Sequence, residues 1–270
     1  MNYGEKIIEL RKKMREKHPL IHHITNFVVM HSTANGTIAI GASPVMAHSQ
    51  DEVEEMTSFA SALVLNIGTL TKEWIDAMIL AGRKANERGI PVVLDPVGAG
   101  ATSLRTDEAK RILDAVKVSV IRGNPAEVAT LAGEKAAIQG VDSLQEADEV
   151  KHLAPKLARK LSSVVAITGK TDFITDGEVL IACDNGDPML RLVTGTGCLA
   201  TTAIACFSAI SPDPVIASAA GLSYFGLAGE KAAKRAKSPG SFEVALLDSL
   251  YDLTDEEIKE GVKLKYEKAV

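Results

Sequence analysis

The chain has no excess of basic over acidic residues, no paired cysteines and no long apolar run. Its formal charge of −5 provides no electrostatic footprint for a nucleic acid, so we expect no nucleic-acid partner. No apolar run reaches the roughly 20 residues of a membrane-spanning helix, so we expect no membrane association. The three cysteines are odd in number and form no metal-type pair. They favour a reducing compartment without disulfides, and we expect a cytoplasmic protein.

Aromatic residues are also scarce, at 4% of the chain, whereas Ala, Val, Ile and Leu supply most of the 46% that is apolar. This composition is typical of parallel strands covered by helices. A chain of 270 residues can bury one large core, and no Pro/Ser-rich linker, repeat or low-complexity segment divides it. We therefore expect a single α/β domain over residues 1–270, in which residues 238–270 form a helical segment without a motif.

Strand and helix patterns alternate along the chain. Short buried strands that alternate with helices predict right-handed crossovers and a mostly parallel sheet flanked by helices. The pair Asp176-Gly177 predicts a hairpin and hence an antiparallel part. The expected helices are Tyr3–Lys17 and Thr71–Arg88, and the expected strands are Ala62–Ile67, Val92–Leu94, Val118–Ile121, Val164–Ile167, Phe173–Thr175 and Val179–Cys183.

Polar residues follow several of these strands, and the carboxyl ends of parallel strands meet at one edge of a sheet. Asp95, Arg122 and Thr168 should therefore lie close together, with Asn124 and Glu127 beside them. Asp95 precedes a glycine-rich loop and could orient a hydrated Mg²⁺, or it could accept hydrogen bonds from the amides of a turn. Thr168 could border a nucleotide or simply end its strand. The residues alone leave both questions open.

The run from Arg122 to Glu127 carries more information. Asn124 fits a helix N-cap with Pro125 at the first helical position, which places Glu127 at the third. That geometry is typical of a capping box, and it would also suit a metal-bound water and a phosphate. Arg122 favours the second interpretation, because a cap needs no arginine and a guanidinium binds phosphate well.

The segment from Gly195 to Cys198 indicates an anion site. It follows a strand-like run, Met189–Val193, and precedes an apolar stretch, Cys198–Ile210, that we expect to be a buried helix. Small residues there leave the first amides of a helix open to a ligand, and the helix dipole favours an anion. The same dipole should lower the pKa of Cys198, although a small buried cysteine is the common alternative.

Taken together, the motifs closely resemble the hydroxyethylthiazole kinase family, in the same order and roughly from Met1 to Lys237. The resemblance implies a ribokinase-like fold and the phosphorylation of 4-methyl-5-(2-hydroxyethyl)thiazole by ATP with Mg²⁺ in thiamine salvage. It also implies a homotrimer with the thiazole site at a subunit interface. The residues that carry it are His22–Asn26, Gly41–Met46, Asp95–Gly100, Arg122–Glu127 and Gly195–Cys198.

The resemblance also implies roles for single residues. Cys198 lies where sugar kinases of the superfamily carry an aspartate base, and a cysteine there is usual in the thiazole kinases, so it is the expected catalytic residue. The other expected contacts are Met46, Gly195 and Asn26 for the thiazole, Arg122, Thr168, Asn124 and Gly197 for ATP, and Asp95 and Glu127 for Mg²⁺.

The sequence leaves three alternatives open. A hydroxymethylpyrimidine or pyridoxal-type kinase would typically have aspartate in place of Cys198 and lack the His22–Asn26 stretch. An ATP-dependent NAD(P)H-hydrate dehydratase would usually keep a Gly-Thr-Gly-Asp motif. A non-catalytic nucleotide-binding protein would bind ATP without turnover.

Overall fold

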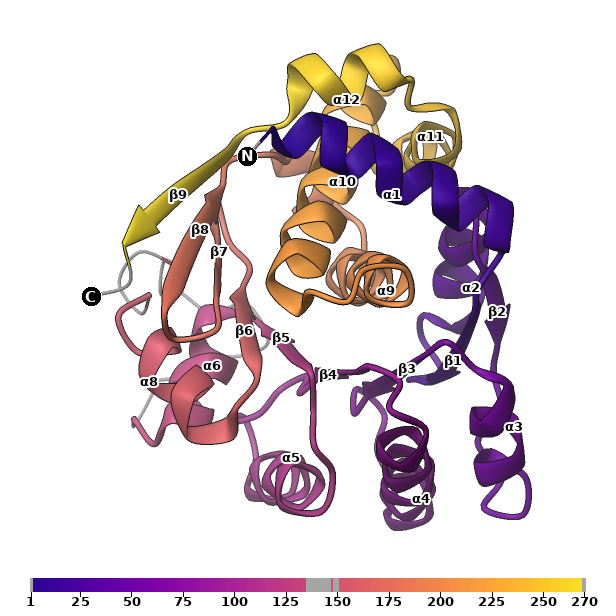
Figure 1. Ribbon diagram of the computed structural model, residues 1–270, viewed down its shortest axis with the longest axis vertical. Helices are drawn as coiled ribbons and strands as arrows, with labels where there is room; N and C mark the ends of the chain where they lie inside the picture. The colour runs from indigo at the N-terminus through magenta and orange to yellow at the C-terminus, as the bar shows by residue number, and fades with distance from the viewer. Residues whose placement is uncertain (1, 135–146, 148–150, 269–270) are drawn as a thin grey trace.

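A nine-stranded sheet forms the middle of the molecule, and helices cover both of its faces (Figure 1). The computed structural model describes residues 2–134, 147 and 151–268. The strand order is β2-β1-β3-β4-β5-β6-β7-β8-β9. In chain order the strands are β1 (Leu20–Ile24), β2 (Ser43–Val45), β3 (Ala62–Asn66), β4 (Val92–Asp95), β5 (Val120–Gly123), β6 (Val164–Ile167), β7 (Asp172–Thr175), β8 (Val179–Cys183) and β9 (Leu264–Lys268).

The six strands from β2 to β6 pair in parallel, and β7, β8 and β9 extend the sheet in antiparallel fashion. The mostly parallel sheet is therefore confirmed, as is the hairpin at Asp176-Gly177, where Gly177 has a φ of +101°. Because β1 and β3 to β6 all end at the same edge, the segments that follow them are neighbours in space.

Two apolar cores fill the space between the sheet and its helices. None of the helices that the structure describes is long and apolar enough to cross a bilayer. One core packs under α1 (Tyr3–Lys17), α2 (Met30–Ile40), α9 (Thr196–Ser208), α10 (Pro214–Arg235), α11 (Pro239–Asp252) and α12 (Asp255–Gly261). The other packs under α3 (Val53–Phe59), α4 (Lys72–Arg88), α5 (Ser103–Ala115), α6 (Pro125–Ala132) and α8 (Ala154–Leu161).

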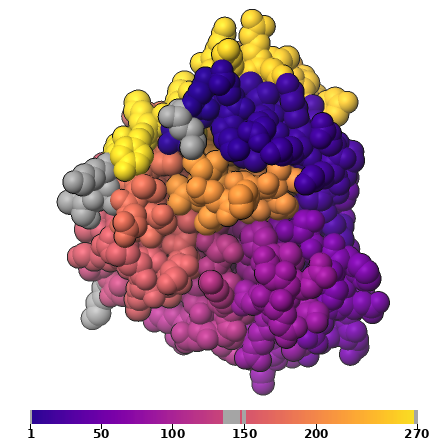
Figure 2. Space-filling view, viewed as in Figure 1, coloured from indigo at the N-terminus to yellow at the C-terminus, as the bar shows by residue number. Residues whose placement is uncertain are grey.

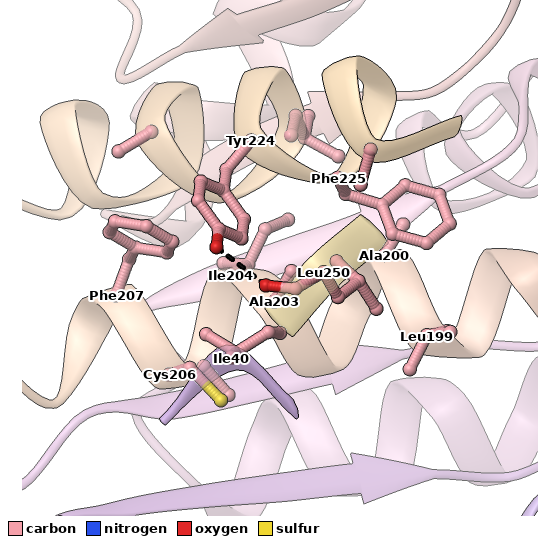
Figure 3. Close-up of a cluster of buried hydrophobic side chains, with 14 of the residues drawn as sticks. Ile40, Leu199, Ala200, Ala203, Ile204, Cys206, Phe207, Tyr224, Phe225 and Leu250 are labelled. Carbon is pink, nitrogen blue, oxygen red and sulfur yellow. Dashed lines mark hydrogen bonds between the residues drawn. The ribbon is translucent and has the colours of Figure 1, made fainter. Parts of the chain in front are cut away.

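Helix α9 is held firmly against the sheet and against α10. The Tyr224 hydroxyl of α10 donates a hydrogen bond to the Leu250 carbonyl at 2.6 Å, and Phe207 packs beside the tyrosine ring (Figure 3). Gly221 of α10 lies so close to α9 that a Cβ there would come within 2.7 Å of the Ile204 backbone. This packing holds the second half of α9 against α10.

Two expectations from the sequence were wrong. Residues expected as the strand Met189–Val193 form a 3₁₀ helix, Pro188–Leu192, because Asp187 accepts a hydrogen bond from the Met189 amide and Pro188 suits the first helical position. The segment after residue 238 is also not helical throughout. It contains α11 and α12 as expected and then β9, which pairs with β8 at the edge of the sheet.

Candidate active site

Three of the expected site residues meet at the ends of adjacent strands. Asp95 ends β4, Arg122 lies near the end of β5, and Thr168 follows β6. Arg122 Nη1 lies 3.6 Å from Asp95 Oδ2, and Arg122 Nη2 donates a hydrogen bond to Thr168 Oγ1. The convergence of these polar residues is therefore confirmed, and the guanidinium lies between a carboxylate and a hydroxyl.

The first turn of α9 packs directly against this arginine. Gly197 is required for the approach, because a Cβ there would lie 2.8 Å from Arg122 Nη1. Gly195 is required for a different reason: its φ is +82°, and a Cβ would lie 2.6 Å from Val29 Cγ1. No side chain caps this end of α9. The amides of its first turn and the Arg122 guanidinium thus form a cationic cradle suited to an anion.

The segment that contains α9 also reaches the surface. In Figure 2 the orange part of the chain lies across the middle of one face, between the indigo N-terminal helix and the magenta strands and helices. Residues 195–198 are half-buried, whereas Leu199 and Ala200 are buried. The beginning of the helix is therefore the part that a ligand can reach.

Cys198 belongs to a hydrogen-bond network that joins α9, β3, β4 and the loop after β1. Its Sγ accepts hydrogen bonds from Asn66 Nδ2 at 3.2 Å and from Asn26 Nδ2 at 3.6 Å. Asn66 Nδ2 also donates to Asp95 Oδ2 at 3.0 Å, and Thr201 Oγ1 donates to the same oxygen at 2.7 Å. The thiol and the carboxylate are thereby held by a shared donor.

The electrostatics of Cys198 are opposite to the expectation from the sequence. Burial raises the pKa of the thiol to about 12, and the neighbouring Asp95 carboxylate adds to that effect. The charge of Arg122 and the hydrogen bonds from Asn66 and Asn26 act in the other direction, but burial and the Asp95 charge have the larger effect on the pKa. Burial also raises the pKa of Asp95, while the Arg122 guanidinium opposes the shift. The expected lowering of the Cys198 pKa was therefore wrong.

Glu127 and Asn124 form the capping box that the sequence indicated. Asn124 Oδ1 accepts from the Glu127 amide at 2.9 Å, and Glu127 Oε2 accepts from the Asn124 amide at 2.7 Å. The second oxygen, Oε1, accepts from the Gly98 amide at 2.7 Å, which ties the loop after β4 to the loop after β5. Burial, followed by the charge of Asp95, raises the pKa of Glu127 to about 7.

Asp95 and Glu127 suit a metal ion whose other ligands are phosphate oxygens and waters. The buried Asp95 Oδ1 has no hydrogen-bond partner among the described residues. The same part of the chain holds no group of three or more His, Cys, Asp or Glu side chains that could bind a metal alone. Mg²⁺ typically uses one or two carboxylates together with phosphate oxygens and waters. The donor set therefore fits Mg²⁺ in the presence of a phosphate ligand.

The two remaining substrate candidates lie at the ends of β1 and β2. Asn26 follows β1, is buried, and donates to Asn66 Oδ1 at 2.7 Å. Met46 directly follows β2 and is half-buried. Met46 follows the edge strand β2, whereas Asn26 follows β1, which is one strand further into the sheet. Asn26 is thus part of the network around the thiol, whereas Met46 makes none of the hydrogen bonds of that network.

Sequence reasoning missed three residues that shape this site. Asn66 and Thr201 hold Asp95, as described above. Arg105 of α5 donates to the Val97 and Gly68 carbonyls, each at 2.7 Å, and so joins two loops beside the site. Asn66 could have been found, because it ends a strand just as Asp95 does, but the apolar pattern extended the expected strand to Ile67. Nothing in the local sequence marks Arg105.

Comparison with known proteins identifies the family. The sequence model described as the hydroxyethylthiazole kinase family matches residues 11–256. The chain belongs to the hydroxyethylthiazole kinase family. A relative named hydroxyethylthiazole kinase, from Desulfosudis oleivorans, is 57% identical over 265 residues, which are 97% of each protein. The family makes the chain an enzyme of the kinase class, and the alternatives of a dehydratase or a non-catalytic binder are set aside.

Solved structures agree with this family and identify the fold. The structure of the hydroxyethylthiazole kinase protein from Pyrococcus horikoshii has a TM-score of 0.90 at 44% identity, and the match covers 98% of this chain and 100% of that one. A ribokinase-like superfamily protein from Enterococcus faecalis has a TM-score of 0.60 at 12% identity, with 86% of each chain covered. The second likeness shows the fold alone, and the expected ribokinase-like α/β fold is confirmed.

Proposed function

We propose that this enzyme transfers the γ-phosphoryl group of ATP to the primary hydroxyl of 4-methyl-5-(2-hydroxyethyl)thiazole, giving the thiazole phosphate used in thiamine biosynthesis. The observation that carries the proposal is the cradle formed by Arg122 and the first turn of α9 beside Asp95. Phosphoryl transfer depends mainly on positioning and charge stabilisation, and these groups supply both. The relative from Desulfosudis oleivorans that shares 57% of its residues supports the choice of substrate.

Each group of the cradle has a distinct task in the proposed reaction. The amides of the first turn of α9, including that of Gly197, bind the migrating phosphoryl group. Arg122 offsets the negative charge on its oxygens, and its contact with Thr168 keeps the guanidinium in place. Thr168 and Asn124 border the nucleotide, at the ends of β6 and β5.

Asp95 and Glu127 are the residues that would hold Mg²⁺. When bound, Mg²⁺ would neutralise part of the charge on the ATP phosphates. Asp95 offers the unpartnered Oδ1, and Glu127 holds the adjoining loop through the Gly98 amide. The two carboxylates therefore differ: Asp95 has an oxygen without a hydrogen-bond partner among the described residues, whereas both Glu127 oxygens already accept backbone amides, so Glu127 would hold the ion through a metal-bound water.

Cys198 is the proposed contact of the reacting hydroxyl. Because burial raises the pKa of the thiol to about 12, the group is neutral at pH 7 and is a weak base. A neutral thiol cannot take up the hydroxyl proton, so in a loose transition state the proton leaves late and passes to an oxygen of the transferred phosphoryl group. The side chain can therefore contribute mainly by orienting the hydroxyl toward the phosphorus.

The thiazole pocket is proposed to include Asn26, Met46 and the Gly195 backbone, and to be completed by a second subunit of a homotrimer. Phe27 and Val28, which follow Asn26, are 62% and 64% exposed. Two adjacent apolar side chains beside a substrate site suit a surface that another chain covers. We further propose that the trimer acts in the cytoplasm.

The test is a turnover assay with ATP, Mg²⁺ and a panel of four alcohols. The panel contains the hydroxyethylthiazole, hydroxymethylpyrimidine, pyridoxal and ribose. We expect phosphorylation of the thiazole and loss of that activity in the Asp95→Ala variant, with ATP binding and thermal unfolding measured in parallel. Preferential turnover of another alcohol would refute the proposed substrate while leaving the phosphate chemistry intact.

A further inference from the structure

Asn66 is a buried amide whose four hydrogen-bonding positions are all used. It ends β3 and is 1% exposed. Its Oδ1 accepts from Asn26 Nδ2 at 2.7 Å and from the Gly68 amide at 3.0 Å. Its Nδ2 donates to Asp95 Oδ2 at 3.0 Å and to Cys198 Sγ at 3.2 Å. A buried polar group that is fully satisfied is held in one orientation.

Two backbone amides make that orientation unambiguous. The Val28 amide donates to Asn26 Oδ1 at 3.1 Å, so the Nδ2 group of Asn26 must point at Asn66. The Gly68 amide likewise fixes the oxygen of Asn66, because a backbone N–H can only donate. The Asn66 Nδ2 group therefore faces the sulfur and the carboxylate and cannot be exchanged with its oxygen.

From this geometry we infer that Asn66 is a positioning residue of the phosphoryl-transfer site, which sets the place of the Cys198 sulfur relative to Asp95. The inference rests on the proposed function. One NH₂ group spans the two acceptors, so the rotamer of Cys198 and that of Asp95 are coupled through it. With Oδ2 committed to Asn66 and Thr201, Oδ1 is the Asp95 oxygen left for a ligand. Asn66 itself acts through these neighbours and touches no substrate.

The test is a double-mutant cycle between Asn66→Ala and Cys198→Ala. We expect Asn66→Ala to lower kcat by about 10- to 100-fold, because small misplacements of reacting groups cost rate steeply. The KM for ATP should stay within about twofold, because the cradle at Arg122 is intact. In the Cys198→Ala background, the same substitution should cost less than about threefold. Equal losses in the two backgrounds would overturn the inference.

Asn185→Ala is the matched control. Asn185 is also buried and also bridges several groups: its Nδ2 donates to Glu230 Oε1 at 3.0 Å and to the Gly261 carbonyl at 2.9 Å. It lies beyond β8, away from the site. We expect it to lower the thermal stability without lowering kcat. A loss of kcat equal to that of Asn66→Ala would show that the latter is only structural and would overturn the inference.

Two further measurements test the inference even if Asn66→Ala folds poorly or Cys198→Ala is too slow to assay. Asn66→Asp keeps the shape and the oxygen that faces Gly68, but it replaces the donor group; we expect the same loss of kcat. Independently of turnover, the rate at which iodoacetamide alkylates Cys198 should change by at least about threefold in Asn66→Ala and stay unchanged in Asn185→Ala. An unchanged rate in both, or full activity of Asn66→Asp, would contradict the inference.

The assay separates this inference from the proposed function. Wild-type turnover of the thiazole tests the function, and the Asn66 cycle compares variants on whichever alcohol the wild type phosphorylates. A different preferred alcohol would refute the substrate and leave the cycle interpretable. The alkylation rates need no turnover at all.

Discussion

The contact between Gly197 and Arg122 gives the sharpest prediction, because activity and stability should move in opposite directions. Gly197→Ala would place a Cβ 2.8 Å from Arg122 Nη1 and 3.0 Å from Nη2. The guanidinium is the end of a flexible side chain, so it can move aside without disturbing the backbone. Alanine favours a helix over glycine by about 0.8–1.0 kcal/mol, so the variant should fold at least as well as the wild type.

The displaced guanidinium would lose its place between Asp95 and Thr168. A hydrogen bond to a charged group contributes about 1.5–3 kcal/mol. If the transition state loses one such hydrogen bond from Arg122, kcat/KM should fall by about 10- to 150-fold. The assay is steady-state phosphorylation with ATP varied, alongside thermal unfolding. Gly240→Ala is the control, since its Cβ would meet nothing within 4 Å.

One result would refute this reasoning. If Gly197→Ala kept wild-type kcat/KM while remaining folded, Arg122 could not be working from the position that the structure gives it. As a further check, Gly197→Ala should add little to the loss caused by Arg122→Gln, because both changes remove the same guanidinium.

The other predictions concern the thiol, a buried carboxyl and the packing of α9. Cys198→Ala should lower kcat by less than Asp95→Ala does, and Cys198→Asp should stay active; a folded, ATP-binding but inactive Cys198→Asp enzyme would exclude the role in contacting the hydroxyl. Burial raises the pKa of Asp172 from 3.8 to about 7. Between pH 3.8 and about 7, the folded protein keeps this proton whereas the unfolded chain has released it. The free energy of unfolding of the wild type therefore falls as the pH rises through this range. Asp172→Asn cannot lose a proton and so avoids this pH-dependent loss of stability. Its free energy of unfolding in urea, relative to that of the wild type, should increase by up to about 4 kcal/mol from pH 4 to 8. A difference that does not change with pH would contradict the prediction. Gly221→Ala should lower the free energy of unfolding by about 1–3 kcal/mol or more, because its Cβ would meet the Ile204 backbone at 2.7 Å, and a thermal midpoint equal to that of Gly240→Ala would refute this.

Much of the fold could be predicted because its signals are local. The helix Tyr3–Lys17 has the bounds that its charged periodic pattern indicates. The helix expected at Thr71–Arg88 is found at Lys72–Arg88, with Thr71 as its N-cap accepting from the Trp74 amide. The prediction of a strand at Met189–Val193 was wrong because Asp187-Pro188 is a helix-start signal, which here overrides the apolar pattern that follows it. Strand β9 could not be predicted, because it depends on the free edge of β8.

The site shows the same division between local and distant causes. Asp95, Arg122 and Thr168 were found by one rule, that polar residues at the ends of parallel strands converge. The pKa of Cys198 could not be found in that way. The helix start that suggested a lowered pKa is local, but burial and the charge of Asp95, which raise the pKa, depend on segments far away in the sequence. From the sequence, the lack of a side chain at Gly197 was expected to let a ligand approach the backbone. In the structure, the Arg122 guanidinium occupies the place that a Cβ would take.

Glu127 shows why a structural interpretation and a functional one need not compete. The capping box that begins α6 uses one carboxylate oxygen, and the other oxygen binds the Gly98 amide of the loop that follows Asp95. The bonds that start a helix therefore also fix the distance between the ends of β4 and β5, from which Asp95 and Arg122 face each other. Asn66 does the same between β3, β4 and α9. The proposed catalytic geometry is thus set by residues that also satisfy ordinary backbone and side-chain hydrogen bonds. A capping motif at a strand end therefore indicates function when its second oxygen reaches a neighbouring loop.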